Sequence, residues 1–176
     1  DYNRAGVPLM ELVTEPVIHD AATAGRFAKE LQLLLRTLGA GEANMEKGEM
    51  RVEANVSVGR NSVMGTKVEI KNLNSFKAME RAVDYEIRRQ IELIGKGGLV
   101  KQETLGWDDA RQKTFSQRTK EGSADYRYFP DPDLLPVVID DAWIAKVRST
   151  MPALPADLRA QWQADYGLSA YDVQLL

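Results

Sequence analysis

The sequence of 176 residues contains no cysteine and a single histidine, His19. Without cysteine the chain cannot form a disulfide, a thiolate metal site or a cysteine nucleophile. A single histidine rules out a zinc site built from several histidines and argues against a Ser-His-Asp triad. We interpret His19 as a solvent-facing or capping residue before a helix. Chemistry within this chain must therefore use carboxylates, amines, guanidinium and hydroxyl groups, which suit a hard cation such as Mg²⁺ and phosphate substrates.

The chain also lacks a large net charge and long apolar runs. The 26 acidic and 23 basic residues give a net charge of −3, so there is no general basic signal for nucleic acid. The apolar content of 44% is typical of a soluble globular protein. No apolar run reaches membrane-spanning length, which predicts no transmembrane helix and no membrane partner. Neither a Walker-type nor a G-x-G-x-x-G motif occurs, so ATP binding cannot be inferred from those motifs.

Hydrophobic periodicity predicts the helices. The clearest are Ala21–Leu38, with Asp20 as N-cap, and a long helix over residues 76–94 after the capping segment 72–75. The apolar stripe expected to face the core from the long helix is Phe76, Met79, Val83, Ile87, Ile91 and Ile94. Shorter helices are predicted over 142–150, over 156–166 and from 170 onward, the last with a Ser169–Asp172 capping box.

Alternation of apolar and polar residues predicts the strands. They are expected at 7–13, 49–58, 66–71, 99–107, 112–118 and 137–139. The pair 49–58 and 66–71 forms a hairpin with one apolar face and one charged face. The fold class is therefore α+β, an antiparallel sheet with flanking helices, followed near residue 140 by the start of an all-helical region.

The charged face of this hairpin is the most informative feature of the sequence. One register places Glu53 opposite Glu69 and Arg51 opposite Lys71, and such like charges repel unless a cation or an anion lies between them. A divalent cation between the carboxylates and a phosphate near the basic pair would relieve both repulsions. A register two residues away pairs Glu53 with Lys71 and Glu69 with Asn55, and predicts an ordinary solvated surface. The pattern leaves both registers open.

Two other segments carry candidate chemistry. Glu11 lies in the otherwise apolar strand 7–13, where it is either a functional carboxylate or an exposed residue of an edge strand. Residues 118–130 combine cations, aromatic residues and a proline. That mixture can hold a nucleotide or an RNA end by stacking and phosphate contact, or it can form a surface loop pinned by its aromatic side chains.

Several unusual sequence motifs, called the family words below, occur in a fixed order along the chain. They are DYNRAGVPLMELVTEP (1–16), NME (44–46), RVEANVS (51–57), GTKVEIKNLNSF (65–76), QET (102–104), and RTKE with DYRYFPDPDL (118–134). In this order they resemble the B subunit of the glutamyl/aspartyl-tRNA amidotransferase (GatB) family. The archaeal E subunit, which serves the same kind of reaction on tRNA-Gln, shares some of these words and is the nearest alternative.

The resemblance implies a carbon–nitrogen ligase with glutamine as nitrogen donor. The family's B subunit uses ATP and Mg²⁺ to phosphorylate the side-chain carboxylate of mischarged Glu-tRNA(Gln) or Asp-tRNA(Asn). Ammonia that the A subunit releases from glutamine then displaces the phosphate. The implied partners are the A and C subunits and the mischarged tRNA, in the bacterial cytoplasm or an organellar matrix. A non-catalytic scaffold or tRNA-binding segment is the alternative from a different functional class.

The resemblance also implies a fold and a site. Residues 1–140 correspond to part of a catalytic cradle similar to the glutamine synthetase fold, and residues 141–176 to the start of a helical domain. The implied catalytic and metal carboxylates are Glu11, Glu53 and Glu69, although the family usually has Asp where Glu53 stands. Candidates for ATP or tRNA-end contact, chosen on charge and position, are Arg51, Lys67, Lys71, Lys120 and Arg127. Because the family's other metal-ligand words and its tail domain lie outside residues 1–176, we expect this piece alone to be inactive.

Overall fold

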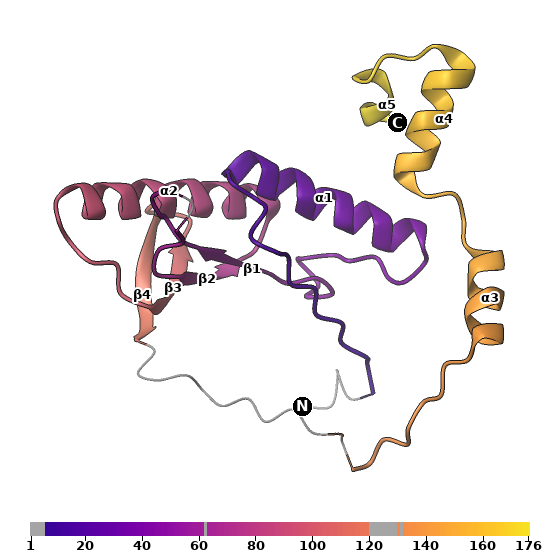
Figure 1. Ribbon diagram of the computed structural model, residues 1–176, viewed down its shortest axis with the longest axis horizontal. Coiled ribbons are helices and arrows are strands. Elements are labelled where there is room, and N and C mark those ends of the chain that lie inside the picture. The colour runs from indigo at the N-terminus through magenta and orange to yellow at the C-terminus, as the bar shows by residue number, and fades with distance from the viewer. Residues whose placement is uncertain (1–5, 62, 120–129, 131) are drawn as a thin grey trace.

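The computed structural model describes residues 6–61, 63–119, 130 and 132–176, which form an α+β fold around a four-stranded sheet (Figure 1). In chain order the elements are α1 (Ala21–Thr37), β1 (Val52–Val56), β2 (Val68–Leu73), α2 (Phe76–Gly95), β3 (Glu103–Asp108), β4 (Lys113–Thr119), α3 (Asp141–Thr150), α4 (Pro155–Tyr166) and α5 (Asp172–Leu175). Figure 1 shows α1 and α2 along one side of the sheet, with α3, α4 and α5 beyond its end.

The sheet is mixed, with the strand order β1-β2-β3-β4. The β1–β2 and β3–β4 pairs are antiparallel, whereas β2 and β3 run parallel. The prediction of an antiparallel sheet was therefore wrong at its central pair. A parallel pair needs a long crossover, and α2 supplies it between β2 and β3. The predicted order of strand, long helix and strand already contained this signal.

Both long helices begin where the sequence predicts. The Asp20 carboxylate accepts a hydrogen bond from the backbone amide of Thr23 at 2.7 Å, and the Ser75 hydroxyl accepts one from Ala78 at 3.0 Å. These caps satisfy amides that have no partner within the helix. Gly39 follows the end of α1 with φ of +65°, a left-handed conformation that glycine adopts without strain.

The core lies between α2 and the sheet, and α1 packs on α2. The buried residues of this core are Ala28, Val56, Ile70, Leu73, Ala78, Met79, Ala82, Val83 and Trp107. The buried face of α2 differs from the predicted apolar stripe. Ile91 is 54% exposed, while Glu86 and Gln90 are fully buried. The stripe was predicted on the assumption that polar side chains face water, but these two make hydrogen bonds inside the protein.

Two predicted strands do not form. Residues 7–13 and 137–139 have no regular structure, and their apolar side chains are exposed, as with Leu9 at 95% and Val138 at 81%. A strand requires a neighbouring strand for its backbone hydrogen bonds, and the alternation of residue types cannot supply one. The other four predicted strands are present as β1, β2, β3 and β4, and their ends differ from the predicted ends by a few residues.

The C-terminal helices pack less extensively than α1 and α2. Every residue of α3 is exposed. One bidentate ion pair joins α4 to α1, from Arg159 to Glu30 at 2.8 and 3.0 Å. The predicted capping box before α5 is confirmed, because the backbone amide of Ser169 donates to the Asp172 carboxylate and the backbone amide of Asp172 donates to the Ser169 hydroxyl, each at 3.2 Å. Within the residues described, no helix is long and apolar enough to cross a membrane.

Candidate functional site

The charged side chains of the hairpin lie on the face of the sheet opposite to α2. Along β2, the fully buried Val68 and Ile70 alternate with the more accessible Glu69 and Lys71. The β1–β2 register pairs Asn55 with Glu69. From Ala54 to Val56 this is the second of the two predicted registers, the one that predicted an ordinary solvated surface, and the direct opposition of two glutamates in the first register was wrong. An irregularity between Val52 and Ala54 interrupts the pairing at Glu53.

Lys71 lies between the two carboxylates of this face. Its ammonium nitrogen Nζ is 3.0 Å from Oε1 of Glu53 and 3.5 Å from Oε1 of Glu69. The hydrogen bond to Glu53, aided by the charges of both glutamates, raises the pKa of Lys71 against partial desolvation. The lysine is therefore a cation at neutral pH, and it pairs with Glu53 as the second register predicts.

The third strand contributes a residue that sequence reasoning missed. Thr104 of β3 is buried, and the parallel register places it beside Glu69. Its hydroxyl Oγ1 donates a hydrogen bond of 2.9 Å to Oε2 of Glu69. The signal was present, because QET is one of the family words, but an antiparallel sheet gave no reason to place Thr104 next to Glu69. The bond restrains one oxygen of Glu69, whose side chain is only 16% exposed.

The face continues across β3 onto β4. Gly106 is the register partner of Lys71. A Cβ atom at Gly106 would lie 2.5 Å from Cζ of Phe115 and 2.6 Å from Nε2 of Gln117, so glycine allows these β4 side chains to lie close to β3. Phe115 is 44% exposed. The open face of the sheet therefore carries an accessible aromatic ring, Phe115, on the β4 side of Lys71.

The remaining predicted cations are dispersed. Arg51 is exposed just before β1, and Lys67 is exposed just before β2. Because β1 and β2 are antiparallel, these two residues lie at opposite ends of the pair. Lys120 and Arg127 lie outside the described residues.

Glu11 is exposed in the extended segment that precedes α1. In the part of the chain that the structure describes, no three His, Cys, Asp or Glu side chains form a possible metal-ligand group. The structure thus brings Glu53 and Glu69 to one lysine and does not bring Glu11 to them. The site of three carboxylates stays a prediction. Two carboxylates on one open face still fit Mg²⁺, which is usually held by one or two protein carboxylates together with substrate phosphates and water.

A buried polar network lies on the other side of the sheet, where α2 meets the end of β1. The Gln90 side chain donates to Glu86 at 2.8 Å and to the backbone carbonyl of Val56 at 3.2 Å, and it accepts from the backbone amide of Val58 at 2.9 Å. Glu86 also accepts two hydrogen bonds from Arg89. The network satisfies backbone groups at the last paired residue of β1, Val56, and just beyond it at Val58, so its role is structural.

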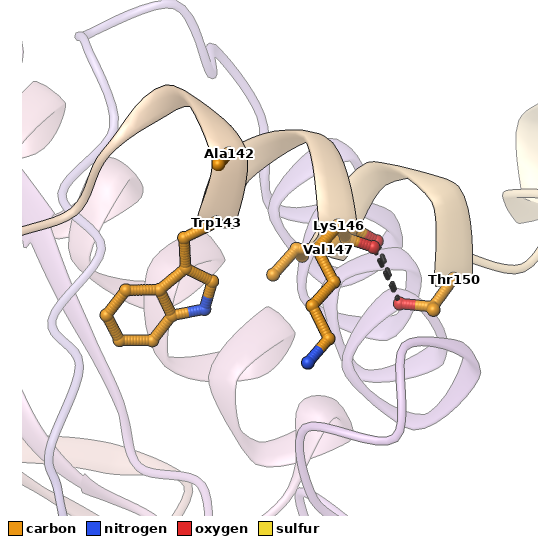
Figure 2. Close-up of a pocket in the computed structure, with 5 residues that line it drawn as sticks. All are labelled: Ala142, Trp143, Lys146, Val147 and Thr150. Atoms are coloured by element: carbon orange, nitrogen blue, oxygen red, sulfur yellow. Dashed lines mark hydrogen bonds between the residues drawn. The ribbon is translucent and has the colours of Figure 1, made fainter.

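A shallow hollow on α3 is a poor candidate for the site. It is lined by Ala142, Trp143, Lys146, Val147 and Thr150, which all belong to this one helix (Figure 2). A ligand site usually has walls from several elements and a few convergent polar groups. The carboxylates and the lysine of the open face lie on other elements, so we place the candidate site on the sheet.

Comparison with known proteins gives a consistent result. The model of the GatB/GatE catalytic domain family matches residues 1–145. The relatives are B subunits of aspartyl/glutamyl-tRNA(Asn/Gln) amidotransferases, and the chain is 61% identical to that of Polynucleobacter asymbioticus, 54% to that of Ralstonia pickettii and 49% to that of Trichormus variabilis. Each match covers 100% of this chain and 36% of the relative. The chain therefore spans little more than a third of the length of these relatives.

Proposed function

The chain belongs to the GatB/GatE catalytic domain family, and from this premise we propose that it is part of the transamidating B subunit of a tRNA amidotransferase. The proposed substrates are Glu-tRNA(Gln) and Asp-tRNA(Asn), in agreement with the names of the relatives. The words shared with the archaeal E subunit make the archaeal version of the reaction the nearest alternative, but the three relatives compared are all B subunits by name.

The proposed reaction has two steps. An oxygen of the side-chain carboxylate of the mischarged amino acid attacks the γ-phosphorus of ATP, the bond to the β-phosphate oxygen breaks, and ADP leaves. Ammonia then attacks the acyl carbon, phosphate leaves and a proton is lost, which gives Gln-tRNA or Asn-tRNA. Both steps place negative charge on phosphate oxygens, so catalysis rests on positioning and on cations.

The open face of the sheet supports this chemistry, and the pair of glutamates that share Lys71 is the observation that carries the proposal. Glu53 and Glu69 would hold Mg²⁺, with Glu11 as the third predicted carboxylate. When bound, the ion neutralises charge on the transferring phosphoryl group. Lys71 would contact a phosphate, and the hydrogen bond from Thr104 would keep Glu69 in place. Further phosphate or tRNA-end contacts are assigned to Arg51, Lys67, Lys120 and Arg127.

The domain assignment is part of the proposal. Residues 1–140 would form part of a cradle of the glutamine synthetase type, and residues 141–176 the first part of a helical domain. The mixed sheet with helices on one side and the start of α3 at Asp141 are compatible with this division. The proposed partners are the A subunit, which would supply ammonia from glutamine, and the C subunit.

A non-catalytic scaffold or tRNA-binding segment would not need two carboxylates on one face. We therefore expect Glu69→Gln, in the full-length protein assembled with its A and C partners, to abolish ATP-dependent phosphorylation of the mischarged tRNA while glutamine hydrolysis continues. Glu80→Gln is a matched comparison, because Glu80 pairs with Lys29 at 3.2 Å on the helical layer and should keep normal activity. Normal turnover of Glu69→Gln would remove Glu69 from the site and favour the scaffold.

A further inference from the structure

The contacts of Lys71 suggest a role beyond binding a phosphate. Its ammonium group contacts one oxygen of Glu53 and one of Glu69, so it occupies the position between the carboxylates that a divalent cation would also favour. Resting on the proposed function, we propose that Lys71 is an internal counter-ion that the divalent cation displaces, and that the freed ammonium group then pairs with a phosphate of the nucleotide.

The three side chains differ in how firmly they are held. Glu69 is largely shielded and receives the hydrogen bond from the buried Thr104. Glu53 and Lys71 have 46% and 39% of their side chains exposed. A lysine has a flexible four-carbon stem, so its ammonium group can move while Glu69 keeps its place. Lys71 thus holds the two carboxylates near each other before a metal binds, and Lys71 is the member of the cluster that the metal would displace.

Electrostatics favours this exchange when both ligands are present. A divalent ion interacts with each carboxylate through twice the charge of an ammonium group. The displaced ammonium group finds a new anionic partner in a phosphate, and a charge-assisted hydrogen bond of that kind is a strong one. Nucleotide should therefore tighten metal binding, and metal should tighten nucleotide binding by the same factor. Without nucleotide, Lys71 competes with the metal and weakens its binding.

The test measures Mn²⁺ binding to the full-length protein in its complex, with Mn²⁺ replacing Mg²⁺ as an ion that also prefers oxygen ligands. Titration is followed by the electron paramagnetic resonance of free Mn²⁺, with and without ADP. Because two partly exposed ion pairs are lost, Lys71→Met should bind Mn²⁺ about twofold to thirtyfold more tightly without nucleotide. The same variant should lose most of the increase in Mn²⁺ affinity that ADP produces in the wild type.

Three further variants make the result specific. Lys29→Met removes a lysine that is also paired with a glutamate, at 3.2 Å on the helical layer, and should leave Mn²⁺ affinity unchanged. Lys71→Arg keeps the charge and should bind Mn²⁺ as weakly as the wild type. In the double variant Lys71→Met with Glu69→Gln, the gain in affinity should disappear, since one carboxylate of the pair is lost.

Other outcomes overturn the inference. They are an unchanged or weaker Mn²⁺ affinity in Lys71→Met, an equal gain in Lys29→Met, and a gain that persists when Glu69 is replaced. The proposed function has its own test in the phosphorylation assay of Glu69→Gln. If Glu69→Gln phosphorylated the mischarged tRNA normally but the Mn²⁺ titrations gave the expected results, the proposed function would fail and the exchange at Lys71 would stand. If Glu69→Gln lost phosphorylation but the Mn²⁺ titrations did not give the expected results, only the exchange would be ruled out.

Discussion

The two faces of the sheet differ sharply along a single strand. Ile70 of β2 is fully buried under α2, while the next residue, Lys71, is partly exposed between two carboxylates. The covered face holds the elements together by apolar burial, and the open face carries the charges that can do chemistry. Substitutions at adjacent positions should therefore fail in opposite ways, one in stability and the other in cation and phosphate binding.

The largest effect is expected on the covered face. Ile70→Ala would leave a cavity in the core against α2 and should lower the free energy of unfolding by about 2–5 kcal/mol. Urea denaturation would measure this loss, and Lys71→Ala is the neighbouring substitution for comparison. If both variants lost similar stability, the contrast between a stabilising covered face and a ligand-binding open face would be wrong.

A smaller effect is expected from the polar network beneath α2. Gln90→Leu removes the partners of the Val56 carbonyl and the Val58 amide, and should lower the free energy of unfolding by on the order of 2–3 kcal/mol. Hydrogen exchange should show faster opening at the end of β1 than in β3. Equal protection of Val58 in the variant and the wild type would mean that Gln90 does not hold this segment.

The smallest loss of stability is expected on the open face itself. Thr104→Val keeps the shape of the side chain and removes the donor to Glu69, so unfolding should change by about 1 kcal/mol or less. Mn²⁺ affinity in the presence of ADP should nevertheless fall, because Glu69 loses the bond that orients it. Thr114→Val, on β4 opposite Trp107, is the matched control and should leave Mn²⁺ affinity unchanged. An effect of equal size in both variants would point to a general weakening of the sheet.

Much of the local structure could be predicted from the sequence. The bounds of α1 and α2 follow from the caps at Asp20 and Ser75 and from helical periodicity, and the hairpin follows from alternation. These signals depend on residues close together in the chain. The capping box at Ser169 is also a signal from residues close together in the chain, and its two hydrogen bonds are present.

Long-range relations could not be predicted in the same way. The parallel pairing of β2 with β3 depends on how α2 packs, and it alone brings Thr104 to Glu69. Residues 7–13 have a strand-like pattern, but the pattern cannot name a neighbouring strand. The choice between the two hairpin registers was also open, because each satisfied the apolar face equally well. Glu69 and Lys71 were identified as candidates, whereas the contact between Lys71 and both glutamates required the structure.

The crossover between β2 and β3 also bears on how this face assembles during folding. Glu53 and Lys71 are 18 residues apart and meet within a local hairpin, whereas Glu69 and Thr104 are 35 residues apart and meet only after α2 has packed. Contacts of greater sequence separation carry a larger loop-closure cost and generally form later. We therefore expect the lysine–carboxylate contacts to form early in folding, and the hydrogen bond that orients Glu69 to be among the last contacts made in the sheet.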